Sequence, residues 1–152
     1  MKKIKFEIII SACLLGIPCR YSGKAKLNEE ALKLFLGGKA LLVCPEIASG
    51  QKTPRPACEI INGDGHDVLK GKARVIDKDG NDYTDEFIKG AKVVLNEVVD
   101  RHNIKKALLK SGSPSCGVNN IYSGKFNGNK IKGCGVLSAL LKENGIDNIK
   151  EL

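Results

Sequence analysis

The chain contains 152 residues, which is enough for one domain with a hydrophobic core of its own. Its formal net charge at pH 7 is +8, but the lysines are scattered along the sequence and form no long basic run. Four phenylalanines, three tyrosines and no tryptophan argue against a stacking platform for single-stranded nucleic acid, so a nucleic-acid partner is not favoured.

The six cysteines raise the question of the redox compartment. In a secreted chain they would suggest a disulfide framework. The apolar segment before Cys13, however, is interrupted by Lys5 and Glu7, whereas a signal peptide needs an unbroken apolar stretch of about 7–15 residues. No segment reaches the roughly 18 apolar residues of a membrane span. We therefore expect a cytoplasmic protein without membrane association, in which thiols stay reduced and clustered cysteines bind metal.

Two strands and one helix are predicted in the first third of the chain. Apolar runs over residues 5–12 and 39–44 predict the strands. Between them, Asn28 followed by two glutamates predicts the start of a helix, which a pair of glycines ends. The next stretch, residues 47–72, combines prolines with several glycines, and we expect it to be irregular. No helix is expected directly after Gly63-Asp64-Gly65, which distinguishes this segment from a phosphate-binding loop.

The second half predicts an alternation of hairpins, helices and one more strand. An Asp-Gly turn predicts a hairpin over residues 73–83, and Thr84 is expected to cap a helix with an apolar face. The remaining elements are a third strand over 106–110, a hairpin over 120–132 and a helix between Gly135 and Gly145. Short buried strands separated by helices predict an α/β fold: a single domain over residues 1–152, with a mainly parallel sheet flanked by helices and small hairpin insertions.

Three cysteines, Cys13, Cys44 and Cys116, each follow an apolar run at the point where a turn begins. In an open parallel sheet the ligand crevice lies beyond the carboxyl ends of the strands, so three thiols delivered there predict a site. Their long separations exclude compact ferredoxin runs and C-x-x-C motifs. The alternative is three buried, inert thiols, because free cysteine is among the most buried residue types. Spacing alone leaves both interpretations open.

A series of motifs in the same order resembles the DUF523 family over essentially the whole chain. They lie at residues 11–16, 19–21, 44–46, 53–56, 63–75 and 113–117. A characterised branch of that family is the thiouracil desulfidases, which remove sulfur from 2-thiouracil with a [4Fe-4S] cluster. The resemblance therefore implies an enzyme of this type with a small thiolated base as its substrate.

The same resemblance implies roles for individual residues. Cys13, Cys44 and Cys116 would bind the [4Fe-4S] cluster and leave its fourth iron open to the substrate sulfur. Glu46 and Ser113 would be the catalytic helpers, with the carboxylate moving protons. The alternatives are a surface or helix-capping glutamate and an ordinary turn serine.

Four further residues are candidate substrate contacts: Arg20, Arg55, Ser111 and Ser115. Two positions depart from the family pattern, because Ser22 stands where Asp is common and Gly112 where Arg is common. Both departures lie in loops beside the expected site and bear on the substrate rather than on the cluster.

The other three cysteines rank below the first set, because none of them directly follows a strand. Cys19 lies close to Cys13 in sequence and is an alternative ligand or sulfur acceptor, whereas Cys58 has no assigned role. Cys134 is expected at the start of the last helix, where the helix dipole lowers a thiol pKa.

The expected function is therefore the non-redox desulfuration of a thiolated nucleobase such as 2-thiouracil, with release of hydrosulfide. Two alternatives remain open. One is cluster-dependent sulfur transfer to or from tRNA thionucleosides, which salt-sensitive RNA binding would favour. The other is a non-enzymatic metal-binding protein. The sequence determines neither the natural substrate nor the oligomeric state.

Overall fold

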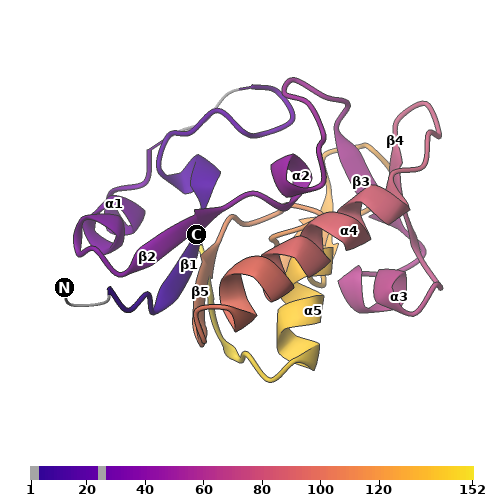
Figure 1. Ribbon diagram of the computed structural model, residues 1–152. Coiled ribbons are helices and arrows are strands. Elements are labelled where there is room, and N and C mark those ends of the chain that lie inside the picture. Colours follow the sequence, from indigo (N-terminus) through magenta and orange to yellow (C-terminus); the bar gives the residue numbers. More distant parts are fainter. Residues whose placement is uncertain (1–3, 24–26) are drawn as a thin grey trace.

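A parallel sheet with strand order β2-β1-β5-β8 forms the centre of the molecule in a computed structural model that describes residues 4–23 and 27–152 (Figure 1). The strands are β1 (Ile8–Ser11), β2 (Ala40–Val43), β5 (Lys106–Leu109) and β8 (Asn148–Glu151). The chain leaves β1 toward β2 and later places β5 on the opposite side of β1. Such a reversal of strand order leaves a crevice at the carboxyl ends of the strands. The predicted fold class is confirmed.

The two faces of the sheet are covered by different helices. Because side chains alternate along a strand, Ile10 and Leu108 pack on one face with Ala31 of α1 (Glu29–Leu36). Ile9 and Leu109 belong to the larger core on the other face, with residues of α4 (Thr84–Val94) and α5 (Val136–Glu143). Figure 1 shows these two helices lying together on the same side of the strands.

The first helix begins as predicted, whereas the cap of α4 was predicted wrongly. The Asn28 side chain accepts a hydrogen bond from the Ala31 N–H at 3.0 Å. The Thr84 hydroxyl instead accepts from the Val75 N–H at 2.9 Å, and Tyr83 occupies the N-cap position of α4. Thr84 is buried, so its hydroxyl satisfies a strand amide and not the helix terminus. Beyond Val94 the helix continues as a π-helical segment, η2 (Leu95–Asp100).

The expectation of an irregular stretch over residues 47–72 was also wrong. Helix α2 (Pro45–Ala48) extends into its first two residues, and the stretch contains β3 (Cys58–Ile61) and α3 (Gly65–Leu69). A helix therefore does follow Gly63-Asp64-Gly65. It forms because Asp64 accepts from the His66 and Asp67 N–H groups, while the Asp67 carboxylate accepts from the Asp64 N–H.

The hairpins were predicted in part. The expected turn is present at Gly80, but β4 (Arg74–Asp77) pairs along its length with β3, and the returning segment adds a single bridge between Ile76 and Asp82. The second hairpin, β6 (Asn120–Tyr122) with β7 (Lys130–Lys132), is confirmed. The last helix is confirmed as well, while strand β8 after it was not predicted.

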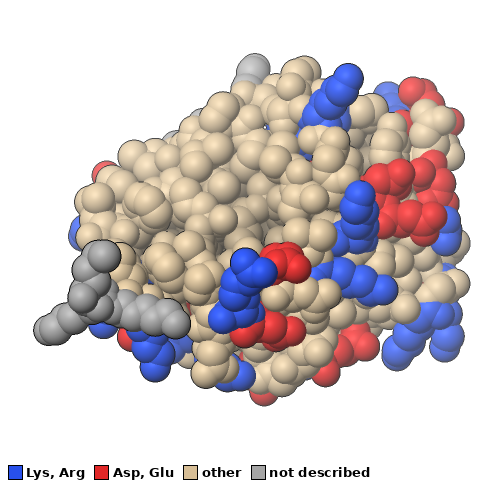
Figure 2. Space-filling model, in the orientation of Figure 1, with Lys and Arg blue, Asp and Glu red and all other residues tan. Residues whose placement is uncertain are grey.

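Charged side chains are distributed unevenly over the face shown in Figure 2. Lysine and arginine are interspersed with acidic residues on the side of α3, α4 and β4, and a broad uncharged area covers β2 and the segments near α2. No helix in the described part of the chain is long and apolar enough to cross a membrane.

Candidate functional site

A cavity of about 420 Å³ lies at the carboxyl edge of the sheet. Its lining includes all three predicted ligands, Cys13, Cys44 and Cys116, together with Glu46 and Ser113. The fold brings these residues together because β1, β2 and β5 are neighbours and run in the same direction. Residues of segments 55–59 and 122–130, which lie in or next to the antiparallel pairs β3–β4 and β6–β7, also line the cavity.

Each thiol is placed by the turn that follows its strand. Cys13 lies in the 3-10 turn η1 (Ala12–Leu14), and Cys44 is the N-cap residue of α2. Cys116 lies in the turn after β5 and is buried, whereas Cys13 and Cys44 are partly exposed to the cavity. All six cysteines are free thiols.

Cys19 is a fourth thiol of the site, which the sequence analysis ranked too low. It is buried, it lines the cavity, and it forms side-chain hydrogen bonds with Cys13 and Cys44. Its carbonyl oxygen lies 3.8 Å from the Cys44 sulfur. The available signal was its position in the loop that leaves Cys13, since residues of one tight loop stay close in space.

The thiol pKa values follow from these contacts. The hydrogen bond from Cys19 lowers the pKa of Cys13, and the same bond raises the pKa of Cys19 to about 11. The pKa of Cys44 is raised far above the ordinary thiol range, first by the hydrogen bond with Cys19 and second by burial. Burial raises the pKa of Cys116 to about 12. Binding of a metal group by the thiolates must therefore displace protons.

The remaining two cysteines differ in their surroundings. Cys58 on β3 also lines the cavity, and burial raises its pKa to about 12. Cys134 precedes α5, and its sulfur lies 3.8 Å from the Asp64 carboxylate. Burial, with Asp64 second, raises its pKa to about 11, so the expected lowering by the helix dipole was wrong. The dipole effect is small compared with the removal of a thiolate from water.

The Glu46 carboxylate is buried, with 8% of the residue surface exposed. One oxygen, Oε2, lies 3.4 Å from the Cys44 sulfur and 3.8 Å from a guanidinium nitrogen of Arg55. The other oxygen, Oε1, accepts a hydrogen bond from the Ser115 hydroxyl. A buried carboxylate needs partners of this kind, because removing an unpaired charge from water is expensive. The surface-glutamate alternative is therefore wrong.

Arg55 is oriented by its own loop. The Arg55 guanidinium donates to the Thr53 hydroxyl at 3.1 Å, and the backbone N–H of Arg55 donates to the Tyr21 carbonyl at 2.7 Å. The side chain is about as buried as that of Glu46. The structure thus places Arg55 beside the carboxylate as a countercharge within the cavity wall.

The two serines near Cys116 occupy different places. Ser113 lines the cavity. Its hydroxyl accepts hydrogen bonds from the N–H groups of Ser115 and Cys116 at 3.1 and 3.0 Å. Ser115, a predicted substrate contact, is completely buried and lies behind the cavity wall. Its hydroxyl contacts Ser113, Glu46 and the Cys116 sulfur.

The loop that carries Cys116 is held by the start of α5 and by β8. The carbonyl oxygens of Pro114 and Ser115 accept from the first N–H groups of α5, which have no partner within the helix. The loop approaches the helix so closely that a Cβ at Gly135 would lie 2.5 Å from the Ser115 carbonyl. The Glu151 carboxylate accepts from the Val118 and Asn119 N–H groups at 2.7 and 2.8 Å.

Polar and aromatic side chains also line the cavity. Arg20 and Ser111, two predicted substrate contacts, are among them, and the Ser111 hydroxyl accepts from Lys110 at 3.4 Å. The Lys130 ammonium lies 5.3 Å from the centre of the Tyr122 ring. Gly112, with φ +74°, leaves the space into which Lys130 extends, 3.3 Å from where a Cβ would stand.

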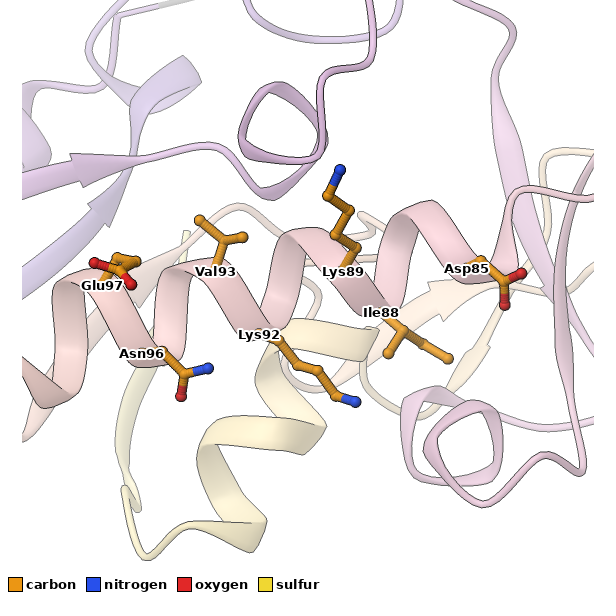
Figure 3. A pocket seen from close by; sticks show the side chains of 7 residues that line it. All are labelled: Asp85, Ile88, Lys89, Lys92, Val93, Asn96 and Glu97. Atoms are coloured by element: carbon orange, nitrogen blue, oxygen red, sulfur yellow. The ribbon is translucent and has the colours of Figure 1, made fainter.

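Two other hollows lack converging functional groups. One, of about 400 Å³, follows the exposed side of α4 and η2, where Asp85, Lys89, Lys92 and Glu97 point in different directions (Figure 3). The second, of about 580 Å³, is lined mainly by aliphatic side chains of β2, α2 and α4 and shares Cys19 and Cys44 with the site. Neither matches the combination of thiols and a buried carboxylate.

The thiols of the site have the chemistry of metal-cluster ligands. Among residues 4–23 and 27–152, no three Cys, His, Asp or Glu side chains lie close enough together to hold one metal ion. Thiolates are soft ligands, which select iron–sulfur clusters over hard cations.

Comparisons with known proteins agree with this chemistry. The family model described as 2-thiouracil desulfurase matches residues 8–152. An uncharacterised Bacillus subtilis (strain 168) protein, YbbK, is 44% identical over 144 residues, which is 95% of each chain. The solved [4Fe-4S]-dependent thiouracil desulfidase TudS is 41% identical, with a TM-score of 0.83 over 97% of this chain and 91% of that one. The family resemblance and the prediction of a desulfidase enzyme are confirmed.

Proposed function

Because the chain belongs to the 2-thiouracil desulfurase family, we propose that it releases the sulfur of a thiolated nucleobase such as 2-thiouracil as hydrosulfide. The proposal includes a [4Fe-4S] cluster, on which the structurally similar thiouracil desulfidase depends. The observation that carries it is the convergence of Cys13, Cys44 and Cys116 on one cavity, with the buried Glu46 carboxylate beside them.

The three strand-end thiolates would hold the cluster, and no fourth protein ligand is required. When bound in this way, the cluster supplies an iron with an open position, a Lewis acid for the thiocarbonyl sulfur. Cys19 is not assigned as a ligand, because it lies in the loop after Cys13 and does not follow a strand directly.

Glu46 moves the protons in the proposed reaction. Water attacks the thiocarbonyl carbon, and the carboxylate accepts the proton that this water loses. The protonated carboxyl then returns this proton to the departing sulfur. The hydroxyl left on the carbon releases its remaining proton to solvent as the carbonyl forms and hydrosulfide leaves. The carbon gains an oxygen and loses a sulfur, so the reaction involves no net transfer of electrons.

Arg55 and Ser113 support the carboxylate and the substrate. Arg55 lies 3.8 Å from Glu46 and holds it near the Cys44 sulfur. The Ser113 hydroxyl lines the cavity next to Cys116, where it lies beside the place of a bound base and of the attacking water. Arg20 and Ser111, which also line the cavity, remain candidate contacts for other groups of the substrate.

The proposed substrate is a small thiolated base, and the proposed compartment is the cytoplasm, where thiols stay reduced. Sulfur transfer to or from tRNA is the rival function. It predicts a preference for RNA-bound bases and an affinity that falls steeply with salt. A protein that only binds metal predicts no turnover with any thiolated base.

The proposal is tested by anaerobic reconstitution with iron and sulfide. The protein should bind about four irons per chain, with broad thiolate-to-iron absorption, and convert 2-thiouracil to uracil with one sulfide released per uracil. Stoichiometric zinc without iron uptake, or iron-loaded protein that releases no sulfide from any thiolated pyrimidine, would contradict it.

A further inference from the structure

The contacts of Ser115 assign it a function different from the predicted substrate contact. We infer that Ser115 is a positioning residue that holds the Glu46 carboxylate and connects it to Ser113, so that protons pass between the carboxylate and the cavity through two serine hydroxyls. The inference rests on the proposed function, in which Glu46 is the acid–base group.

Ser115 cannot reach a substrate directly. The residue is completely buried and does not line the cavity, whereas its neighbours Pro114 and Cys116 do. Its hydroxyl donates to Glu46 Oε1 and lies 3.0 Å from the Ser113 hydroxyl. Ser115 is therefore the link between a group inside the cavity wall and a group on its surface.

The direction of the hydrogen bonds follows from the donors available. The Ser113 oxygen already accepts from the N–H groups of Ser115 and Cys116, at 3.1 and 3.0 Å. A hydroxyl has two acceptor lone pairs and one proton, so the Ser113 proton is left to be donated. Because the Ser115 proton goes to Glu46, the Ser115 oxygen is free to accept from Ser113. The chain of donors therefore runs from Ser113 through Ser115 to the carboxylate.

Proton transfer along this chain conserves both hydroxyls. When Ser115 gives its proton to Glu46, it takes the proton of Ser113. The electron pair of the broken Ser113 O–H bond then takes a proton from the attacking water, while both N–H hydrogen bonds to Ser113 stay in place. The reverse sequence delivers the carboxyl proton to the departing sulfur. One proton moves in each direction, and no oxidant, reductant or covalent intermediate is involved.

The second effect of Ser115 is to fix the orientation of Glu46. The opposite oxygen, Oε2, is bounded by the Cys44 sulfur and Arg55. Without the Ser115 hydroxyl, Oε1 loses a charge-assisted hydrogen bond in a buried place, where water cannot replace it. The carboxylate is then free to turn toward Arg55 and away from the serine chain.

The kinetic test compares Ser115→Ala, Ser113→Ala and the double variant at equal iron loading. Each single change should lower kcat by about 10- to 100-fold, the scale of a lost hydrogen bond to a charged group, with KM nearly unchanged. Because both residues act in one chain, the double variant should be no slower than the slower single variant. Multiplicative effects would overturn the inference, as would a raised KM with kcat unchanged, which would indicate a substrate contact.

Ser138 provides a matched control. It is as buried as Ser115 and touches the same loop, since its hydroxyl donates to the Cys116 carbonyl at 3.0 Å, but it has no contact with Glu46. Ser138→Ala should change kcat by less than about threefold, within the scale of one neutral hydrogen bond. An equal loss of turnover in Ser138→Ala would show that loosening of the loop, not the serine chain, explains the effect.

An infrared measurement tests the same link without turnover or iron. Carboxylate bands that are present in the parent chain and absent from Glu46→Gln belong to Glu46. These bands should shift in Ser115→Ala and stay in place in Ser138→Ala. If the Glu46 bands shift in Ser115→Ala but the iron-loaded parent protein releases no sulfide, the contact between Ser115 and Glu46 is supported and the proposed function is refuted. If the bands do not shift, the inference about Ser115 is refuted, whether or not the parent protein releases sulfide.

Discussion

Substitution of Gly90 by alanine tests how the fold places the site. Gly90 lies inside α4, where alanine normally stabilises a helix by about 1 kcal/mol relative to glycine. In this structure a Cβ at Gly90 would stand 2.0 Å from the carbonyl oxygen and 3.3 Å from the Cα of Pro45. These are backbone atoms, which cannot rotate aside, so α2 and α4 would have to move apart.

The expected sign is therefore opposite to that of helix propensity. Overpacking of this kind typically costs about 1–3 kcal/mol, and a contact with rigid backbone belongs at the upper end. After the propensity gain, Gly90→Ala should lower the free energy of unfolding by about 2 kcal/mol and the Tm by about 4–8 °C. Pro45 stands between Cys44 and Glu46, so iron retention should fall as well.

Thermal unfolding of the parent, Gly90→Ala and Lys92→Ala provides the assay. Lys92 lies on the exposed side of the same helix, and its substitution should change the stability by no more than about 0.5 kcal/mol. If Gly90→Ala is as stable as the parent or more stable, propensity dominates and the close approach of α2 to α4 does not constrain the site.

Three further changes test the site itself. Replacement of Cys13, Cys44 or Cys116 by alanine should each abolish iron retention, whereas Cys134→Ala, outside the cavity, should retain iron; the opposite pattern in an iron assay would refute the ligand set. Glu46→Gln should keep its iron yet lose about 10²-fold or more in turnover, and full activity would remove the carboxylate from the mechanism. Glu151→Ala should lower the free energy of unfolding by about 1–3 kcal/mol and speed hydrogen exchange at Val118 and Asn119, because both amides lose their acceptor. Unchanged exchange would refute the claim that Glu151 holds the loop that carries Cys116.

The sheet and the three strand-end cysteines were predictable because their signals are local. An apolar run followed by a turn that carries a cysteine predicts both the strand and its carboxyl end, and β1, β2 and β5 follow this pattern. Strand β8 lacks it. Only Ile149 among its four residues is strongly apolar, and as an edge strand it needs little burial. Strand β8 is stabilised by its pairing with β5, and its own sequence carries no strand pattern.

The roles of Ser115 and Arg55 were not predictable, because they depend on contacts between distant segments. Ser115 and Glu46 are 69 residues apart in sequence, and nothing in either neighbourhood indicates that the hydroxyl meets the carboxylate. The helix after Gly63-Asp64-Gly65 was predictable in principle. Its signal is the Asp64 and Asp67 pair, a capping box with two aspartates in place of the usual hydroxyl and glutamate.

The site separates into two parts with different physical support. The thiols and Glu46 belong to turns at the sheet edge, and the Cys116 loop is fixed by backbone hydrogen bonds to α5 and by Glu151. Another part of the lining comes from the antiparallel pairs β3–β4 and β6–β7, which lie outside the main sheet. These pairs are not independent of the sheet, because Ile60, Val75 and Ile121 pack in the same buried core as Ile9, Leu109 and Cys116. The two parts of the cavity lining are therefore joined through one core, so a change in the buried face of either pair affects the sheet edge as well.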